Sequence, residues 1–88
     1  MPKVFTERGF EFWIYPNDHP PAHSHVIRGR KKGHGKKSEV LIYLGDERVV
    51  PSLRENRGMR KADVRKALGI ACRRQDELLT AWRNIYGD

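Results

Sequence analysis

The spacing of apolar residues along the first half of the chain predicts short β-strands. Residues 3–6 and 10–15 favour strands, and the turn-forming pair Arg8 and Gly9 separates them. We therefore expect a hairpin with aromatic side chains on both faces of its second strand, so that at least one face contacts something outside the sheet. One face carries Phe10, Phe12 and Ile14, and the other carries Glu11, Trp13 and Tyr15.

Prolines interrupt the strand pattern between residues 16 and 22. Pro16, Pro20 and Pro21 lack the amide donor that regular structure needs, which predicts a stiff loop around His19. The strand pattern resumes from His23 to Arg28, with successive side chains on opposite faces. One face is predicted to hold His23, His25 and Ile27, and the other Ser24, Val26 and Arg28.

A basic segment follows that strand, from Gly29 to Lys37. It has three glycines, five Lys and Arg residues and no acidic residue, which predicts a mobile loop. The clearest strand comes next, over residues 38–44, and a turn leads to a short strand over residues 48–50. Residues 52–60 are predicted to be a polar connector.

From residue 61 the apolar period changes to three or four residues, which is typical of an amphipathic helix. The pattern predicts one long helix, or two nearly collinear helices, from Lys61 to Tyr86. Gln75 occupies a position where an apolar side chain is expected, and Gly87 is a suitable stop.

Strands followed by a helical end predict an α+β fold. We expect a small, mostly antiparallel sheet of four to five strands over about residues 3–50. A chain of 88 residues is expected to form one domain, residues 1–88, around one core. The helical part, about residues 61–86, should cover one face of the sheet through Leu68, Leu78, Trp82 and Ile85.

Charge adds a candidate class of partner. Lys and Arg number 18 against 11 Asp and Glu, so the net charge is +7. This surplus favours anionic partners such as RNA or DNA, although it also serves solubility alone.

Cysteine content and hydropathy bear on the cellular compartment. Cys72 is the only cysteine, which excludes an internal disulfide and a cysteine-based zinc finger and favours a reducing compartment. Its place beside the apolar stripe predicts an inert, partly buried thiol. No apolar run approaches a signal sequence or a membrane span, so we expect a cytoplasmic protein without a membrane partner.

Three histidines within seven residues form the candidate site: His19, His23 and His25. Their chemistry leaves three roles open. They could bind a divalent metal such as zinc, with Asp18 as a ligand or supporting partner. They could act without any cofactor as general acid and base in cleaving an RNA phosphodiester. They could also pack at the sheet edge, hydrogen-bonded to loop backbone.

Cations directly after the cluster are candidate nucleic-acid contacts, because cations bind phosphates and exposed rings such as Trp13 and Tyr15 stack on bases. A solvated loop is the alternative. The helical part adds further positive charge, which favours an extended anionic partner. The predicted contacts are Arg28, Arg30, Lys31, Lys32, Lys36 and Lys37, and the added helix cations are Arg65, Lys66, Arg73 and Arg74.

These features together resemble the bacterial family of domain of unknown function 4160 along nearly the whole chain. The family hallmark is matched by Asp18-His19-Pro20-Pro21, then His23 and His25-Val26. Ala22 departs from the usual proline, and the basic segment is longer than in the family. The other matches are Pro2 to Phe5, Gly9-Phe10, Phe12 to Tyr15, Asn56-Arg57-Gly58, Leu78-Leu79, Ala81-Trp82 and Gly87.

The resemblance implies a gene context similar to toxin–antitoxin pairs, with a small partner protein encoded beside this one. Our leading interpretation is therefore a nucleic-acid-associated module of toxin–antitoxin type with a site at the three histidines. The alternative is a non-catalytic protein-interaction domain whose exposed sheet edge pairs with the partner protein. A metal-dependent hydrolase is the third interpretation, and whether the protein is an enzyme stays open.

Overall fold

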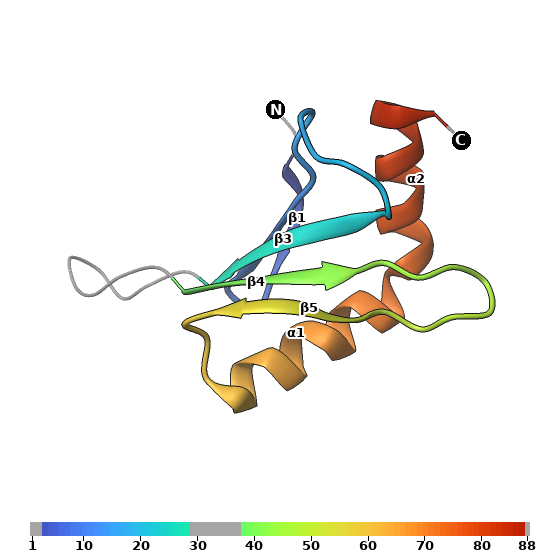
Figure 1. Cartoon of the computed structure of the whole chain (residues 1–88). Helices are drawn as coiled ribbons and strands as arrows, with labels where there is room; N and C mark the ends of the chain where they lie inside the picture. The colour runs from blue at the N-terminus through green and yellow to red at the C-terminus, as the bar shows by residue number, and fades with distance from the viewer. Residues whose placement is uncertain (1–2, 29–37, 88) are drawn as a thin grey trace.

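The chain forms a five-stranded antiparallel sheet followed by two helices (Figure 1), so the α+β prediction is confirmed. The computed structural model describes residues 3–28 and 38–87. The strands lie in chain order across the sheet, so each one pairs with the strand before it. They are β1 (Lys3–Glu7), β2 (Phe10–Trp13), β3 (His23–Arg28), β4 (Ser38–Tyr43) and β5 (Ser52–Arg57), and the helices are α1 (Lys61–Arg73) and α2 (Gln75–Tyr86).

The predicted hairpin is confirmed, with its turn at Arg8 and Gly9. Both residues have a positive φ, 53° and 84°, as the tightest hairpin turns require at their two central positions. The second strand ends at Trp13, two residues earlier than predicted, where the chain leaves the sheet for the proline-rich loop.

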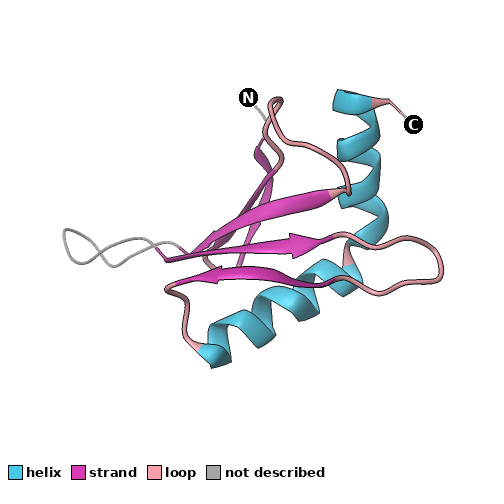
Figure 2. Ribbon diagram, in the orientation of Figure 1, coloured by secondary structure: helices cyan, strands magenta, loops and turns pink. Residues whose placement is uncertain are grey.

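The core lies between the sheet and the helices, which stand together on one side of the strands in Figure 2. Phe10, Phe12 and Ile14 are fully buried on this side, as the alternation predicts. Leu78 and Trp82 of the predicted helical stripe are buried as well, whereas Ile85 is 39% exposed. The apolar side chains that complete the buried cluster are Val26, Val40, Ile42, Leu44, Met59, Val64, Ala67, Ile70, Ala71 and Leu79.

A break at Arg74 divides the helical part, and α2 turns away from the direction of α1 in Figure 1, so the two helices are not collinear. Gln75 explains the interruption of the apolar stripe. Its Nε2 lies 2.9 Å from each of three carbonyl oxygens, those of Leu44, Asp46 and Val49. Gln75 therefore ties the start of α2 to the β4–β5 loop. The new helical phase that begins here places Tyr86 inward and leaves Ile85 exposed.

The last strand lies in the segment predicted to be a polar connector, and the predicted strand over residues 48–50 is wrong. Residues 46–49 instead form a turn closed by a bridge between Asp46 and Val49. All six residues of β5 are exposed, so the strand has no alternation of buried and exposed side chains that a sequence pattern could reveal. Pairing with β4 defines the strand, through partners such as Leu41 with Glu55 and Ile42 with Leu53.

The helices present a polar outer surface. Cys72 is exposed on α1, contrary to the predicted partial burial, because the inward positions around it are taken by Ile70 and Ala71. Within residues 3–28 and 38–87, no helix is long and apolar enough to cross a membrane.

Candidate functional site

The two strand histidines lie on the outer face of the sheet, opposite the core side chains of β3, and the His23 ring at the start of the strand also reaches Trp82 of α2. His25 is paired with Trp13 on one side and with Leu41 on the other, so these three side chains share a face. The neighbouring pairs, Phe12 with Val26 and Val26 with Val40, belong to the core face. The predicted alternation of β3 thus places the histidines outside the apolar core.

The proline-rich loop between β2 and β3 brings Asp18 to these histidines. The Asp18 backbone N–H donates to the Tyr15 carbonyl at 3.2 Å, and the Asp18 carboxylate accepts from the Tyr15 N–H at 3.3 Å. From the other end of the chain, the Tyr86 hydroxyl donates to the same Tyr15 carbonyl. These contacts hold the loop so that the carboxylate of Asp18 faces the start of β3.

His25 lies between two carboxylates. Its Nδ1 is 2.9 Å from Glu39 Oε2, and its Nε2 is 3.2 Å from Asp18 Oδ1. The ring of Tyr15 packs edge-on against the imidazole with centroids 4.6 Å apart. Only 12% of the His25 side chain is exposed, and its neighbours fix the orientation of the ring and occupy both ring nitrogens.

His23 is buried beside it and is oriented by the loop backbone. Its Nδ1 lies 2.9 Å from the carbonyl oxygen of Pro21, so this nitrogen carries the proton and donates it. In the neutral ring the lone pair is therefore on Nε2, which is 3.6 Å from Asp18 Oδ2. The other side of the ring packs near Trp82 of α2, with centroids 5.7 Å apart.

His19 differs from the other two histidines in its exposure to solvent. All three histidines line one hollow of about 230 Å³. His19 is exposed at this hollow, however. Among residues 3–28 and 38–87, only Asp18, His23 and His25 have ligand atoms that all lie within 4.8 Å of one another. The remaining lining residues are Asn17, Pro20, Leu41, Arg54 and Arg57.

Several residues of this site were not found from the sequence. Glu39 bonds His25 and also faces Arg57, with 3.7 Å between the closest charged atoms. Arg57 is held in turn by Glu55 at 2.8 Å. Glu39 and Leu41 alternate with the apolar core positions of β4, so the face of Glu39 could have been predicted. Its pairing with His25 depends on the register of β3 and β4, which no signal in the sequence reveals.

Negative charge surrounds the inner side of the hollow. Burial, together with the carboxylates of Glu39 and Asp18, raises the pKa of Tyr15 above its ordinary value. The Tyr15 hydroxyl therefore stays protonated at neutral pH. The residues that could hold a metal are Asp18, His23 and His25, since they offer one carboxylate and two imidazoles at one point. Two imidazoles beside arginines can also transfer protons during phosphodiester cleavage.

The predicted nucleic-acid contacts are only partly within the described residues. Arg28 lies at the far end of β3, on the core face, where its guanidinium donates to the Arg8 carbonyl at 2.9 Å and lies 4.8 Å from the Phe10 ring centroid. It therefore ties β3 to the first hairpin. The other five contacts lie outside the described residues: Arg30, Lys31, Lys32, Lys36 and Lys37.

Comparison with known proteins gives a family but no activity. No curated protein and no solved structure is similar enough to this chain to match it. A family model described as Domain of unknown function (DUF4160) matches residues 9–83, which include the histidine hollow and all of α1. The chain therefore belongs to the DUF4160 family, as its resemblance predicts.

Proposed function

We propose that this protein is a cytoplasmic, nucleic-acid-associated module of toxin–antitoxin type, and that its histidine hollow receives a phosphate group of RNA. One observation carries the proposal. Three histidines and two arginines, Arg54 and Arg57, line the same hollow although they come from separate segments. Guanidinium groups bind phosphate through paired hydrogen bonds, and imidazole is the most frequent general acid and base in enzymes.

Aromatic rings next to the hollow offer stacking surfaces for bases. Trp13 and Tyr15 are stacked on the outer face with ring centroids 5.9 Å apart. On the neighbouring strands, the Arg54 guanidinium lies 5.8 Å from the ring centroid of Tyr43. Rings and cations along one sheet face are typical of surfaces that bind single-stranded nucleic acid. The net charge of +7 would draw such a ligand to the protein.

Salt-dependent RNA binding tests this proposal. A fluorescein-labelled single-stranded RNA is titrated with the full chain between about 50 and 200 mM salt, and binding is followed by anisotropy. We expect the double variant Arg54→Gln/Arg57→Gln to weaken binding by about tenfold and to flatten the plot of log K against log salt by about 1.4, because each phosphate contact contributes about 0.7.

A matched control variant distinguishes RNA binding at the histidine hollow from general electrostatic attraction by the positive net charge. The variant Lys61→Gln/Arg83→Gln removes the same charge from exposed positions on the helices and should change the salt slope less. Absence of salt-sensitive binding by the unmodified protein, or an equal loss in both variants, would contradict the proposal.

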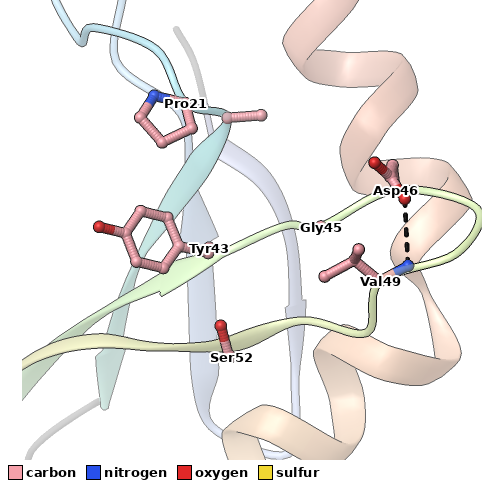
Figure 3. A pocket seen from close by; sticks show the side chains of 7 residues that line it. Pro21, Tyr43, Gly45, Asp46, Val49 and Ser52 are labelled. Atoms are coloured by element: carbon pink, nitrogen blue, oxygen red, sulfur yellow. Dashed lines mark hydrogen bonds between the residues drawn. The ribbon is translucent and has the colours of Figure 1, made fainter.

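A second candidate function, binding of a partner protein, is favoured by the exposed apolar end of the β4–β5 loop. Val49 and Val50 are 54% and 71% exposed, yet the turn that presents them is well ordered by hydrogen bonds. The Asp46 carboxylate accepts from the Val49 N–H at 3.0 Å, as Figure 3 shows, and Gln75 bonds the loop carbonyls. A neighbouring hollow of about 400 Å³ is lined by Pro21, Ala22, Tyr43, Gly45, Asp46, Val49 and Ser52.

If the protein binds its partner through this loop, substitution of the histidines should leave the complex intact. Co-expression with the small protein implied by the family's gene context should give a complex on size-exclusion chromatography. We expect Val49→Asp/Val50→Asp to abolish it and His19→Ala/His25→Ala to leave it intact. Loss of the complex only in the histidine variant would instead favour the histidine hollow.

A further inference from the structure

We propose that Asp18, His23 and His25 form a binding site for a first-row divalent transition metal ion. The ligands would be the carboxylate of Asp18 and the Nε2 atoms of the two imidazoles. This inference deepens the proposed function, since a bound cation would attract the phosphate of a nucleic acid. It can nevertheless be tested without any nucleic acid.

The ring nitrogens that face away from the proposed ion are already engaged. Nδ1 of His23 bonds the Pro21 carbonyl, and Nδ1 of His25 bonds Glu39, both at 2.9 Å. Histidines that bind metals almost always donate their second ring N–H to a carbonyl or carboxylate in this way. Both contacts direct the Nε2 lone pair toward Asp18 when the rings are neutral. The chain therefore provides the ligands together with the groups that orient them.

The separations between the ligand atoms suit a shared ion. Bonds of about 2.0 to 2.2 Å from zinc to nitrogen and oxygen place neighbouring ligands about 3.0 to 3.5 Å apart. Nε2 of His25 is 3.2 Å from Asp18 Oδ1, and Nε2 of His23 is 3.6 Å from Asp18 Oδ2. All three ligand atoms lie within 4.8 Å of one another.

The surroundings also favour a cation. Glu39 lies behind His25, and together with Asp18 it contributes the negative charge felt by the Tyr15 hydroxyl. His23 is only 2% exposed, with its ring near Trp82, so the nitrogen ligands are held rigidly. Two imidazoles and one carboxylate are typical ligands of iron, cobalt, manganese and zinc at sites that keep open coordination positions.

The open positions would face the hollow of about 230 Å³, where His19, Arg54 and Arg57 lie. A phosphate oxygen could bind the metal there while the arginines contact the other oxygens. The competing interpretation is a purely structural one, in which a protonated His25 bridges Asp18 and Glu39 as an ion pair. The two interpretations differ in whether the chain binds added metal at these residues.

Isothermal titration of the chelator-treated full chain with Zn²⁺ tests the inference, and Co²⁺ absorption reports the coordination. We expect one ion per chain, with Asp18→Asn weakening binding by at least tenfold because the amide is a poor ligand. Glu39→Gln, which removes the charge behind His25, should weaken it by about 10- to 100-fold. Asp76→Asn removes an exposed carboxylate of α2 and serves as the matched control.

Further variants decide where the ion binds. His19→Ala should change the affinity by less than about threefold, and thermal unfolding confirms that every variant is folded. His23→Ala removes a proposed ligand directly, but this variant could fail to fold because the His23 ring is buried. In that case the Zn²⁺ affinities of Asp18→Asn and Glu39→Gln still show whether the ion binds at this site. Failure of the unmodified chain to bind Zn²⁺ or Co²⁺, or equal affinity of Asp18→Asn, would overturn the proposal. Metal binding without RNA binding would overturn only the proposed function.

Discussion

The two faces of the sheet are built from the same strands but differ in the interactions that stabilise them. On the helix side, fully buried apolar side chains such as Phe12, Val26 and Val40 form one packed cluster with apolar residues of the helices. On the outer face, His25 and Glu39 project from the neighbouring positions of the same strands and are joined by polar contacts. Strand alternation thus separates the residues that stabilise the fold from those that can carry chemistry.

This difference implies an unequal distribution of stability. The apolar face contributes through area removed from water and close packing, which a single truncation disrupts. The outer face contributes through hydrogen bonds and ion pairs that are partly exposed to solvent, and each of these is worth less. Four substitutions measure the contrast, from the largest expected effect to the smallest.

Phe12→Ala should have the largest effect. The ring is fully buried and stacks on Phe5 with centroids 4.7 Å apart, so its removal leaves a cavity beneath the helices. We expect the free energy of unfolding, measured by urea denaturation, to fall by about 3 to 5 kcal/mol. Val50→Ala, at a position that is 71% exposed, is the control and should cost little. A loss below about 1 kcal/mol in Phe12→Ala would show that this face does not dominate stability.

Asp18→Asn should have a smaller effect on the metal-free protein. The carboxylate bonds His25 and the Tyr15 backbone while its side chain is 16% exposed. Hydrogen bonds to charged groups contribute about 1.5 to 3 kcal/mol, and the amide retains part of them. Urea denaturation of Asp18→Asn and of the control variant Asp76→Asn measures the loss in the free energy of unfolding. A loss as large as that of Phe12→Ala would remove the distinction between the two faces.

Gln75→Ala should cost less again, because it removes hydrogen bonds but leaves no apolar cavity. Two N–H groups of Gln75 serve the carbonyls of Leu44, Asp46 and Val49. We expect a loss of about 1 to 2 kcal/mol, with faster amide hydrogen exchange in the β4–β5 loop. Asn84→Ala, an exposed polar position on α2, is the matched control. Unchanged exchange in the loop would show that Gln75 does not hold it.

Glu7→Gln should slightly lower the stability above about pH 4.5 and flatten the acid limb of the stability profile. Hydrogen bonds from Arg73 and then Arg74, at the end of α1, lower the pKa of Glu7 below its ordinary value of 4.5. A depressed pKa stabilises the fold above pH 4.5, and that contribution disappears as the pH falls through the folded-state value. The melting temperature of the variant should therefore fall less than that of the unmodified protein between pH 5 and the acid range. Glu47→Gln, in the exposed turn, should retain the original slope.

Local patterns were enough to predict the elements that have one buried side. The alternation of Phe10, Phe12 and Ile14 and the helical spacing of Leu78 and Trp82 identify the side chains that are buried. The same reasoning missed β5, whose six residues are all exposed and therefore leave no apolar pattern. It left open whether the helical part is one helix or two, and it did not foresee the change of direction at Arg74. The role of Gln75 was also missed, since it depends on a loop that is 26 to 31 residues away in the chain.

The candidate site also contains some residues that could be identified from the sequence and others that could not. Its strand histidines and the proline-stiffened loop that contains Asp18 and His19 could be identified from sequence, because proline and strand periodicity act over a few residues. The contribution of Glu39 and Arg57 could not be foreseen. Their positions follow from the registers of β4 against β3 and of β5 against β4, including the irregularity between Leu41 and Ile42.

The sequence by itself therefore determined the α+β class, the two faces of each inner strand and the location of the histidine cluster, since these follow from side-chain chemistry and local backbone geometry. Only the tertiary structure decided that Asp18 faces the Nε2 atoms of His23 and His25 while His19 stays at the exposed side of the hollow. That arrangement depends on strand register and loop packing, which are set by contacts between distant segments of the chain.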